Sequence, residues 1–445
     1  MSAIPLVPRI ASEAFARRGN KRISVAQFCA DIQALAQTLP AGDFIINLCQ
    51  NRYTFTVAFF AALANHQTNL LPAKRDTADA RTLAQRFGAC PIISDQGGDD
   101  ADVRVAIEPG GHGETTSPSC NADHVAAIAF TSGSTGEPQA HPKSWRMLDT
   151  WRQVHQRYLP VDPHVPAGLV ATVPSWHMYG LEWAMLLPTI APLTLHCGAD
   201  FYPQDVVRAV SEFSQPTVLV STPVHLRALR QVPSPPSNVA TIVCATAPLD
   251  ASLTTQIEAH FDARIFEIYG CSEIGSLASR FPATNPNWEF FDCFDIAYNN
   301  GAIAVSHREL PDPVTLADHF NRLDHGDGHQ YELIGRTSDI IKIGGKRESL
   351  ANLTHLLMDV DGVDDAVIYE PAALHLPDTG RLGALVVAPG MNSRAIRAAL
   401  AQRMDTAFVP RPIRLVDALP RDRTSKLKRG ELRKLLAQIE RSDHV

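Results

Sequence analysis

Short runs of apolar and β-branched residues alternate with amphipathic segments from about Val125 onward. The short runs are predicted to be buried strands and the amphipathic segments helices, because strands and helices bury apolar residues with different periods. The predicted strands are VAAIAF, GLVATVP, PTVLVS, VATIVC and ARIFEI, and the predicted helices are PQDVVRAVSEF, TPVHLRALRQV and DASLTTQIEAHF. This alternation indicates an α/β fold with βαβ units, in which helices cover the sheets on both faces.

The pattern changes after the segment YELIGRTSDIIKIGG. Helix-like ESLANLTHLLMDV and SRAIRAALAQRM then alternate with strand-like DAVIYE, LGALVVAP and PIRLVD, and the chain ends in a basic tail. About 110 residues with an apolar set of their own are enough for a small domain. We therefore predict a large N-terminal domain over residues 1–335 and a small α+β domain over residues 336–445, with the boundary at Arg336 to Asp339.

The composition is that of an ordinary globular protein, with 45% hydrophobic residues, 20% charged residues and a net charge of −7. It indicates neither global disorder nor attraction to nucleic acid. Eight cysteines without a CxxC pair argue against a zinc ribbon and favour reduced thiols in a cytoplasmic protein. We expect no signal peptide and no membrane span, since the most apolar stretch, LEWAMLLPTIAPLTLHC, contains Glu182 and two prolines.

A polar loop follows the first predicted strand, in the segment AFTSGSTGEPQAHPKSW. Two glycines free its backbone and four hydroxyls line it, as expected for a polyanion site at the carboxyl end of a strand. These residues are Thr131, Ser132, Gly133, Ser134, Thr135 and Gly136. The loop has neither the P-loop lysine nor a GxGxxG string, so alone it fits a structural turn equally well.

Three further strand ends carry small or polar residues, in SWHMYG, ATAPLD and EIYGCSEIGS. Together with the loop, they make the chain resemble the adenylate-forming superfamily of acyl-CoA synthetases, aryl-CoA ligases, luciferases and peptide-synthetase adenylation domains. The phosphate loop of that superfamily typically reads Thr-Ser-Gly-Ser/Thr-Thr-Gly-x-Pro-Lys-Gly. Residues 131 to 138 match this motif, whereas Gln139 and Ala140 do not.

The resemblance extends into the C-terminal third, through LADHF, GRTSDIIKIGGKR and LPRDRTSKLKRGELRKLL. It implies that Asp318 binds the two ribose hydroxyls and that Arg336 contacts ribose or phosphate, with Arg347 as a second contact. Lys426 is then the catalytic lysine, delivered by a mobile C-terminal domain when the substrates are in place.

The superfamily motifs also imply roles for the strand ends of the large domain. Glu273 would hold Mg²⁺, Ser272 would hydrogen-bond the α-phosphate, Tyr269 would stack on adenine, and His177 would face the acid's carboxylate or close its pocket. The remaining expected nucleotide contacts are Thr246 and Ala247, and the expected pocket walls are Trp176, His177, Gly180, Thr222, Ala245, Gly270 and Ser276. Considered singly, Glu273 could equally be a solvated surface acid, and His177 and Tyr269 could be core residues.

The chemistry implied by the resemblance has two half-reactions. Carboxylates do not react with thiols because their leaving group is poor, and attack on the α-phosphate of ATP converts that leaving group into AMP. We expect a Mg²⁺- and ATP-dependent ligase for a small carboxylic acid, either an aromatic acid such as a hydroxybenzoate or a fatty acid. The acceptor would be a phosphopantetheine thiol, of an acyl carrier protein in preference to free coenzyme A, and the variant loop resembles carrier-protein ligases of bacterial aryl-polyene pigment pathways.

Departures from the superfamily pattern leave a second class of function open. Gln139, Ser338 and Ser425 replace usual family residues and favour a non-catalytic nucleotide- or acyl-adenylate-binding regulator, whereas Glu273 and Lys426 argue against it. Lys143, four residues after Gln139, is expected to restore the missing phosphate charge. The net-positive tail over residues 421–441 is expected to meet the acidic surface of a carrier, or to be a solvated helix face.

Overall fold

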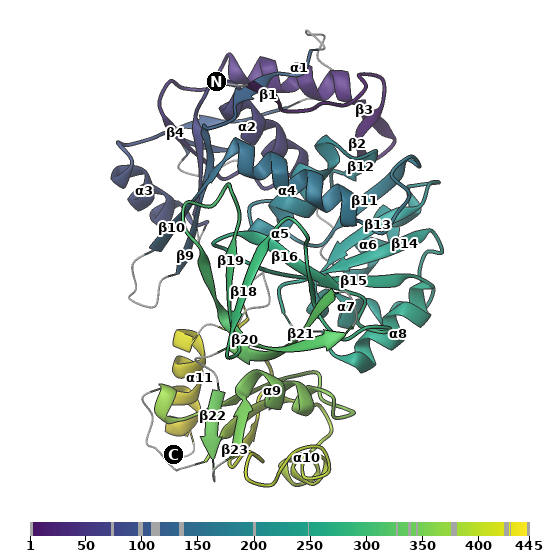
Figure 1. The fold of residues 1–445 in the computed structure, drawn as a ribbon, viewed down its shortest axis with the longest axis vertical. Coiled ribbons are helices and arrows are strands. Elements are labelled where there is room, and N and C mark those ends of the chain that lie inside the picture. Colours follow the sequence, from purple (N-terminus) through teal and green to yellow (C-terminus); the bar gives the residue numbers. More distant parts are fainter. Residues whose placement is uncertain are drawn as a thin grey trace.

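The computed structural model describes residues 3–72, 75–96, 101–107, 116–132, 138–198, 202–247, 249–325, 328–336, 340–343, 346–374, 381–421, 427 and 429–442. A large N-terminal part lies above a smaller C-terminal part in Figure 1. The apolar β-branched runs have become strands at the centre of the larger part, where their side chains are buried.

The main sheet of the large part has nine strands. The six from β15 through β2 are parallel, and antiparallel strands are added at each edge, β16 and β17 at one and β3 at the other. In spatial order its strands are β17 (Glu289–Phe290), β16 (Gly275–Arg280), β15 (Arg264–Cys271), β14 (Val239–Cys244), β13 (Thr217–Ser221), β11 (Ala167–Ala171), β12 (Leu193–His196), β2 (Ala14–Arg18) and β3 (Lys21–Ser24). Four of the five strands predicted from the sequence lie here, in consecutive positions.

Helices cover both faces of this sheet, as the alternating pattern predicts. On one face, α6 (Pro203–Ser211), α7 (Pro223–Leu229) and α8 (Ala251–Phe261) pack Val206, Leu226 and Ile257 against Leu219 and Ile242 of the strands. The opposite face belongs to the largest core, which includes Trp145 and Trp151 of α4 (Trp145–Tyr158) and Trp183 of a π-helix (Leu181–Leu186). The π-helix follows a short turn, α5 (Met178–Gly180), and precedes η2 (Leu187–Thr189).

A second sheet carries the polar loop. Its strands, in spatial order, are β10 (Pro138–Ser144), β9 (Val125–Ser132), β5 (Thr68–Leu71), β4 (Phe44–Asn47), β6 (Ile92–Ser94) and β7 (Val103–Arg104). The first predicted strand is β9, which pairs parallel with β5 and antiparallel with β10. The loop therefore joins the two arms of a hairpin at the edge of this sheet. The other elements of this region are α1 (Val25–Ala36), α2 (Arg52–Ala64), α3 (Thr77–Arg86) and the pair β1 (Ala3–Pro5) and β8 (Ser119–Asn121).

A four-stranded antiparallel sheet, which the sequence patterns did not predict, precedes the C-terminal part. It consists of β18 (Asp295–Asn299), β19 (Ala302–Ser306), β20 (Val314–His325) and β21 (Gly328–Arg336). Phe320 of β20 and Tyr331 of β21 pack on Phe290 of β17, with ring centroids 5.8 and 5.1 Å away. This packing attaches the four-stranded sheet to the edge of the main sheet.

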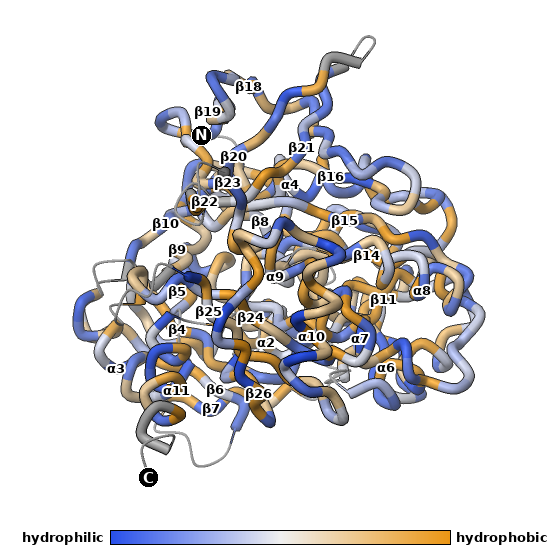
Figure 2. Tube along the Cα trace, turned by 90° about the horizontal axis from the view of Figure 1, so that it is seen from below, coloured by the Kyte–Doolittle hydropathy of each residue, from blue (hydrophilic) through white to orange (hydrophobic). Residues whose placement is uncertain are grey.

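The C-terminal part has its own apolar core, which includes Ile341, Leu353, Ala384 and Ile396. Its elements are β22 (Ile340–Ile343), β23 (Lys346–Ser349), α9 (Leu350–Met358), β24 (Asp365–Tyr369), η4 (Ala372–Leu374), β25 (Gly383–Val387), α10 (Ser393–Leu400), β26 (Ile413–Leu415) and α11 (Arg429–Ser442). Figure 2 looks onto this part from below, with hydrophobic strands and helix faces in orange and hydrophilic connections in blue. The division at residue 336 stays a prediction, although β21 ends there.

The apolar stretch that contains Glu182 is buried in the large part, and residues 181–186 of it form the π-helix. In the part of the chain that the structure describes, no helix combines the length and the hydropathy that crossing a bilayer requires.

Candidate active site

The hairpin formed by β15 and β16 places Glu273 at an exposed turn. In its register, Gly270 pairs with Ser276 and Cys271 with Gly275, so Ser272, Glu273 and Ile274 form the turn. A Cβ atom at Gly270 would lie 2.4 Å from the carbonyl oxygen of Gly275, which explains why only glycine fits this predicted site position. Glu273 is exposed and Ser272 is half-buried, so both side chains lie at the surface of the turn.

Tyr269, Asp318 and Arg336, all predicted nucleotide contacts, are brought together from three strands. The phenol of Tyr269 donates a 2.6 Å hydrogen bond to Oδ2 of Asp318. Asp318 on β20 pairs in register with Arg336 on β21. The ring of Tyr269 is packed by Trp288 and Phe320, with centroids 5.7 and 5.4 Å away. This aromatic packing fixes where the phenol points.

The predicted phosphate loop lies on the hairpin between β9 and β10. Thr131 pairs with Gln139 and Ser132 with Pro138, so the two strands remain paired up to both ends of the loop. The intervening residues 133–137, which include Gly133, Ser134, Thr135 and Gly136, lie outside the described residues. Further along β10, His141 is close enough to Glu273 for its pKa to respond to that carboxylate, although burial is the larger effect and lowers the pKa.

Backbone strain marks the loop after β14. Thr246 is exposed and has a φ of +84°, a left-handed conformation that residues with a Cβ rarely adopt. Such conformations concentrate at ligand-binding sites. Its neighbours Ala245 and Ala247 are buried and half-buried, respectively. The predicted role of Thr246 and Ala247 as nucleotide contacts therefore coincides with a strained loop at a strand end.

The predicted acid-pocket residues around α5 are tightly built. His177 precedes α5, and its carbonyl accepts a 2.7 Å hydrogen bond from the amide of Leu181. A Cβ atom at Gly180 would lie 2.0 Å from the carbonyl oxygen of Pro174, so the backbone passes too closely for another residue. Half-buried Trp176 has the Arg75 guanidinium 4.0 Å above its ring, a cation–π contact that the sequence patterns did not predict.

Two other predicted pocket residues use their hydroxyls within the protein. Thr222 is buried, and its hydroxyl lies 2.8 Å from Nδ1 of His225. Ser276 donates a 2.6 Å hydrogen bond to the buried carboxylate of Glu182. The role of both residues as walls of the acid pocket stays a prediction.

Lys143 lies beneath the Glu273 turn, with its side chain fully buried. Its ammonium donates a hydrogen bond to the backbone carbonyl of Glu273, and burial lowers its pKa to about 8. The ammonium therefore faces the turn from inside the protein, and this arrangement does not support the expected role of Lys143 as a replacement for the phosphate-loop lysine. The physical reason is that the strand β10 turns Lys143 inward, opposite Ala127 of β9.

Glu182 is a member of this site that the sequence interpretation missed. In the sequence it serves only as an argument against a membrane span. A single acid within a long apolar run is, however, a signal for a buried charge with dedicated partners. Glu182 is 1% exposed, and burial raises its pKa to about 7.

Several predicted residues are not placed by the described structure. Lys426, Ser338 and Ser425 lie outside the described residues. Arg347 lies in β23, where its backbone pairs with Lys342. The roles of Lys426 and Arg347 therefore stay predictions.

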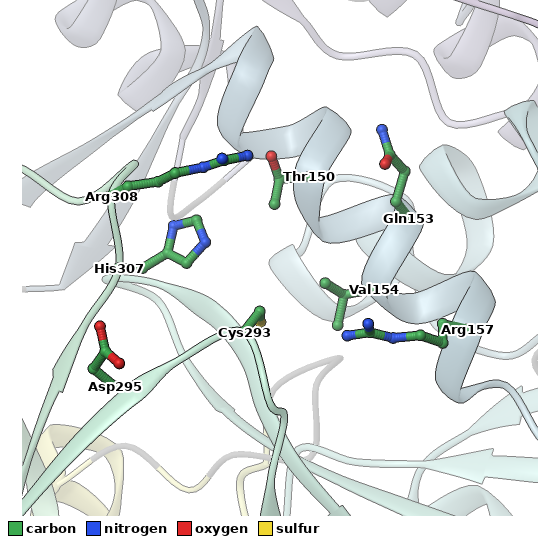
Figure 3. Close-up of a pocket in the computed structure, with 8 residues that line it drawn as sticks. All are labelled: Thr150, Gln153, Val154, Arg157, Cys293, Asp295, His307 and Arg308. Carbon is green, nitrogen blue, oxygen red and sulfur yellow. The ribbon is translucent and has the colours of Figure 1, made fainter.

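A hollow of about 550 Å³ lies between α4 and the β18–β19 region, and none of the predicted site residues lines it (Figure 3). Two of its lining guanidiniums already have acidic partners, since Arg157 pairs with Asp292 and Arg308 lies 3.4 Å from Glu309. Because these positive and negative charges are paired, the hollow does not favour a ligand of either charge. The remaining lining residues are Thr150, Gln153, Val154, Cys293, Asp295 and His307.

Comparison with known proteins agrees with the geometry. The family model described as AMP-binding enzyme matches residues 67–292. A 4-coumarate–CoA ligase of Halorhodospira halophila is 27% identical over 260 residues, which span 54% of this chain and 59% of that ligase. A 3,4-dihydroxybenzoate–[aryl-carrier protein] ligase of Bacillus anthracis is 22% identical over 324 residues, which span 69% of this chain and 73% of that protein.

Solved structures share the fold over nearly the whole chain. An anthranilate CoA ligase in complex with anthranoyl-AMP superposes with a TM-score of 0.78 at 15% identity, covering 98% of this chain and 99% of that one. The o-succinylbenzoate coenzyme A synthetase of Bacillus subtilis, in complex with AMP, gives 0.77 at 17% identity and covers 97% and 98%. Since the family model matches half of its residues, the chain belongs to the AMP-binding enzyme family.

Proposed function

We propose that this protein is an AMP-producing acid–thiol ligase that activates a small carboxylic acid as its acyl-adenylate. The observation that carries the proposal is the convergence of Tyr269, Asp318 and Arg336 from β15, β20 and β21 beside the exposed Glu273 turn. A carboxylate oriented by a phenol accepts hydrogen bonds from a vicinal diol such as ribose. Arg336, whose backbone pairs with that of Asp318, is proposed as a further contact for ribose or phosphate.

The first half-reaction joins two anions. An oxygen of the substrate carboxylate attacks the α-phosphorus of ATP, the bond to the bridging oxygen breaks, and pyrophosphate leaves. The resulting mixed anhydride has AMP as its leaving group. Lys426 is proposed to lie between the two anions, where two unit charges about 4 Å apart interact by roughly 4 kcal/mol at an effective dielectric near 20.

The second half-reaction transfers the acyl group. The sulfur of a phosphopantetheine thiol attacks the acyl carbon, the carbon–oxygen bond to AMP breaks, and the thiol proton is released to solvent. His177, which directly precedes α5 and follows half-buried Trp176, is proposed to face the carboxyl group or to close its pocket.

Glu273 suits a metal ion that is shared with the substrate. Mg²⁺ is usually bound by one or two carboxylates together with phosphate oxygens and water. In the described part of the chain, no group of three or more His, Cys, Asp and Glu side chains could hold a metal ion alone. A single exposed carboxylate at a firmly held turn fits this mode, and the ion, when bound, would neutralise phosphate oxygens.

A carrier protein is the acceptor that we favour over free coenzyme A. Helix α11 buries Leu432 and Leu436 and exposes Arg429 and Arg433, so it presents guanidiniums outward from the small part. Positive charge of this kind is complementary to an acidic carrier surface. The similarity to an aryl-carrier-protein ligase supports the same choice, as does the variant phosphate loop.

Exchange of labelled pyrophosphate into ATP, measured with a panel of aromatic and fatty acids, tests the activity. We expect exchange that requires one class of acid and Mg²⁺. A non-catalytic nucleotide-binding regulator would bind ATP and show no acid-dependent exchange, and this outcome would reject the ligase proposal.

A further inference from the structure

The turn of residues 272–274, together with the first two residues of β16 that follow it, is held from beneath by side chains of three different elements. Lys143 of β10 donates to the carbonyl of Glu273, and Nε1 of Trp151, from α4, donates a 2.8 Å hydrogen bond to the carbonyl of Ile274. Glu182 of the π-helix accepts hydrogen bonds from the amide and the hydroxyl of Ser276, at 3.1 and 2.6 Å. We call Lys143, Trp151 and Glu182 the turn clamp.

The turn lies against the clamp without a gap. Gly275 has a φ of +119°, and a Cβ atom there would lie 2.0 Å from Oε1 of Glu182. Because this contact excludes every side chain, the backbone of the turn can approach the carboxylate directly. Trp183 adds a 3.0 Å hydrogen bond from its Nε1 to the hydroxyl of Ser276.

The charges of the clamp are costly to bury. Lys143 and Glu182 are 0% and 1% exposed. Desolvation opposes both charges and is the largest effect on either pKa, while each charge favours the other. Apolar residues of similar volume often stabilise a core at least as well as a buried ion pair. Core stability alone therefore does not account for these two residues, whereas their hydrogen bonds to the turn do.

We propose that Lys143 and Glu182 are positioning residues that hold the turn from inside and thereby fix the place of the Glu273 carboxylate on its outer side. The inference rests on the proposed function only in that Glu273 is the proposed Mg²⁺ ligand. The holding itself is a property of the protein without substrates.

The physical consequence is a separation between stability and positioning. Replacing Lys143 by methionine removes the donor to the turn and also the cation that favours the charged form of Glu182, so Glu182 must either stay charged at a higher cost or take up a proton. Adding Glu182→Gln removes the cost of both states, so the double variant regains stability without regaining the lysine hydrogen bond. Variants that differ in this way distinguish a positioning role from a purely structural one.

The experiment uses Lys143→Met, Glu182→Gln and the double variant, each in the full-length chain. Arg152→Met is the matched control, because Arg152 is a buried cation of α4 whose partners are Asp149, Thr189 and carbonyls of the N-terminal segment. Hydrogen–deuterium exchange of a peptide that spans the turn is measured without nucleotide or metal. Denaturant midpoints are measured on the same samples.

We expect faster exchange at the turn in Lys143→Met and in the double variant, and unchanged exchange there in Arg152→Met. In pyrophosphate exchange, the Mg²⁺ concentration for half-maximal rate should rise about 10- to 100-fold in the double variant, the range typical of residues that orient a metal ligand. Its denaturant midpoint should meanwhile exceed that of Lys143→Met.

Wild-type exchange at the turn in Lys143→Met, or full recovery of Mg²⁺ dependence together with stability in the double variant, would overturn the proposal. Should these variants fail to fold, Ser276→Ala removes one clamp contact and leaves both buried charges in place. Faster exchange at its turn supports the clamp, and unchanged exchange contradicts it. If the wild type shows no acid-dependent pyrophosphate exchange, the proposed function fails, while hydrogen exchange still decides the positioning role.

Discussion

The phenol of Tyr269 donates a 2.6 Å hydrogen bond to Oδ2 of Asp318, which joins β15 of the nine-stranded sheet to β20 of the antiparallel sheet that precedes the small part. The two residues are 49 positions apart in the chain. The bond orients a carboxylate at the strand position opposite Arg336. It gives Tyr269 a polar function in addition to the adenine contact expected from the sequence.

Removing this bond should weaken ATP binding without loss of the fold. Tyr269→Phe keeps the ring between Trp288 and Phe320 and loses the donor, so Asp318 is less well oriented. A hydrogen bond to a charged group is worth about 1.5–3 kcal/mol. We expect the ATP dissociation constant, measured by calorimetry, to rise by about tenfold in Tyr269→Phe and further in Asp318→Ala. An unchanged dissociation constant in both variants would place the nucleotide elsewhere.

Glu273→Gln should raise the requirement for Mg²⁺ while the fold persists. The amide keeps the shape of the exposed side chain and loses its charge, and Mg²⁺ prefers carboxylate oxygen. The check is the rate of pyrophosphate exchange as a function of Mg²⁺, with thermal unfolding as the control for folding. If the metal dependence of the variant equals that of the wild type, Glu273 is only a surface acid of the turn.

The sequence predicted regular elements well where a single period dominates. The strand VATIVC is β14 residue for residue, and the helix predicted over residues 250–261 is α8 over residues 251–261. In the C-terminal part, the predicted strand at residues 365–370 is β24 over residues 365–369. These segments bury one continuous apolar face, so local pattern and tertiary environment agree.

Other features depend on contacts between distant residues and were not predicted. Apolar and polar residues are mixed along the strands of the β18–β21 sheet, so these strands are defined by their pairing with one another. The sequence predicts Lys143 at the phosphate because it follows the loop, whereas in β10 its side chain is buried beneath the Glu273 turn. The contact between Glu182 and Ser276 spans 94 positions, and no local period encodes it.

The packing of the small part on the large part should weaken on acidification through His355. Burial lowers the pKa of this α9 side chain to about 4, and Arg227 and Arg280 of the large part lower it further while Asp250 opposes them. Since the folded pKa lies below the ordinary 6.5, the stabilising contribution is present above pH 6.5 and is lost as the pH falls toward 4.

The comparison variant is His355→Gln, which keeps a polar side chain that does not titrate. Between pH 7.5 and 5, the denaturant midpoint of the wild type should fall more than that of the variant. Asp359, whose pKa is raised by burial and by Asp250, is present in both proteins, so its opposite contribution cancels in the difference. Parallel pH profiles of the two proteins would show that His355 does not contribute.

Lys426→Ala should lower the rate of adenylation by about 10²- to 10³-fold, the typical loss when one donor at developing charge is removed. Transfer to the thiol from preformed acyl-adenylate should fall much less, because the negative charges of ATP and acid no longer have to be brought together. Single-turnover measurements of each half-reaction separate the two effects. Equal losses in both would require another residue for the adenylation step.

The last prediction concerns the acceptor and the outward face of α11. Arg429 and Arg433 are exposed on this helix, whose opposite side is anchored by Leu432 and Leu436 in the small part. Attraction between these guanidiniums and an acidic carrier surface should speed encounter, and salt should screen it over about 8–10 Å at physiological ionic strength.

The measurement is a competition between coenzyme A and a cognate holo-carrier protein at equal concentrations, with product masses read at low and high salt. We expect the carrier to be acylated preferentially, and its share to fall at high salt and in the double variant Arg429→Glu and Arg433→Glu. Arg208→Glu, on α6 of the large part, is the control for an exposed guanidinium remote from α11 (Figure 1). Because coenzyme A also carries phosphates, the charge reversal alone does not decide the acceptor. Preferential acylation of coenzyme A, or carrier acylation that ignores both salt and charge reversal, would exclude docking through α11.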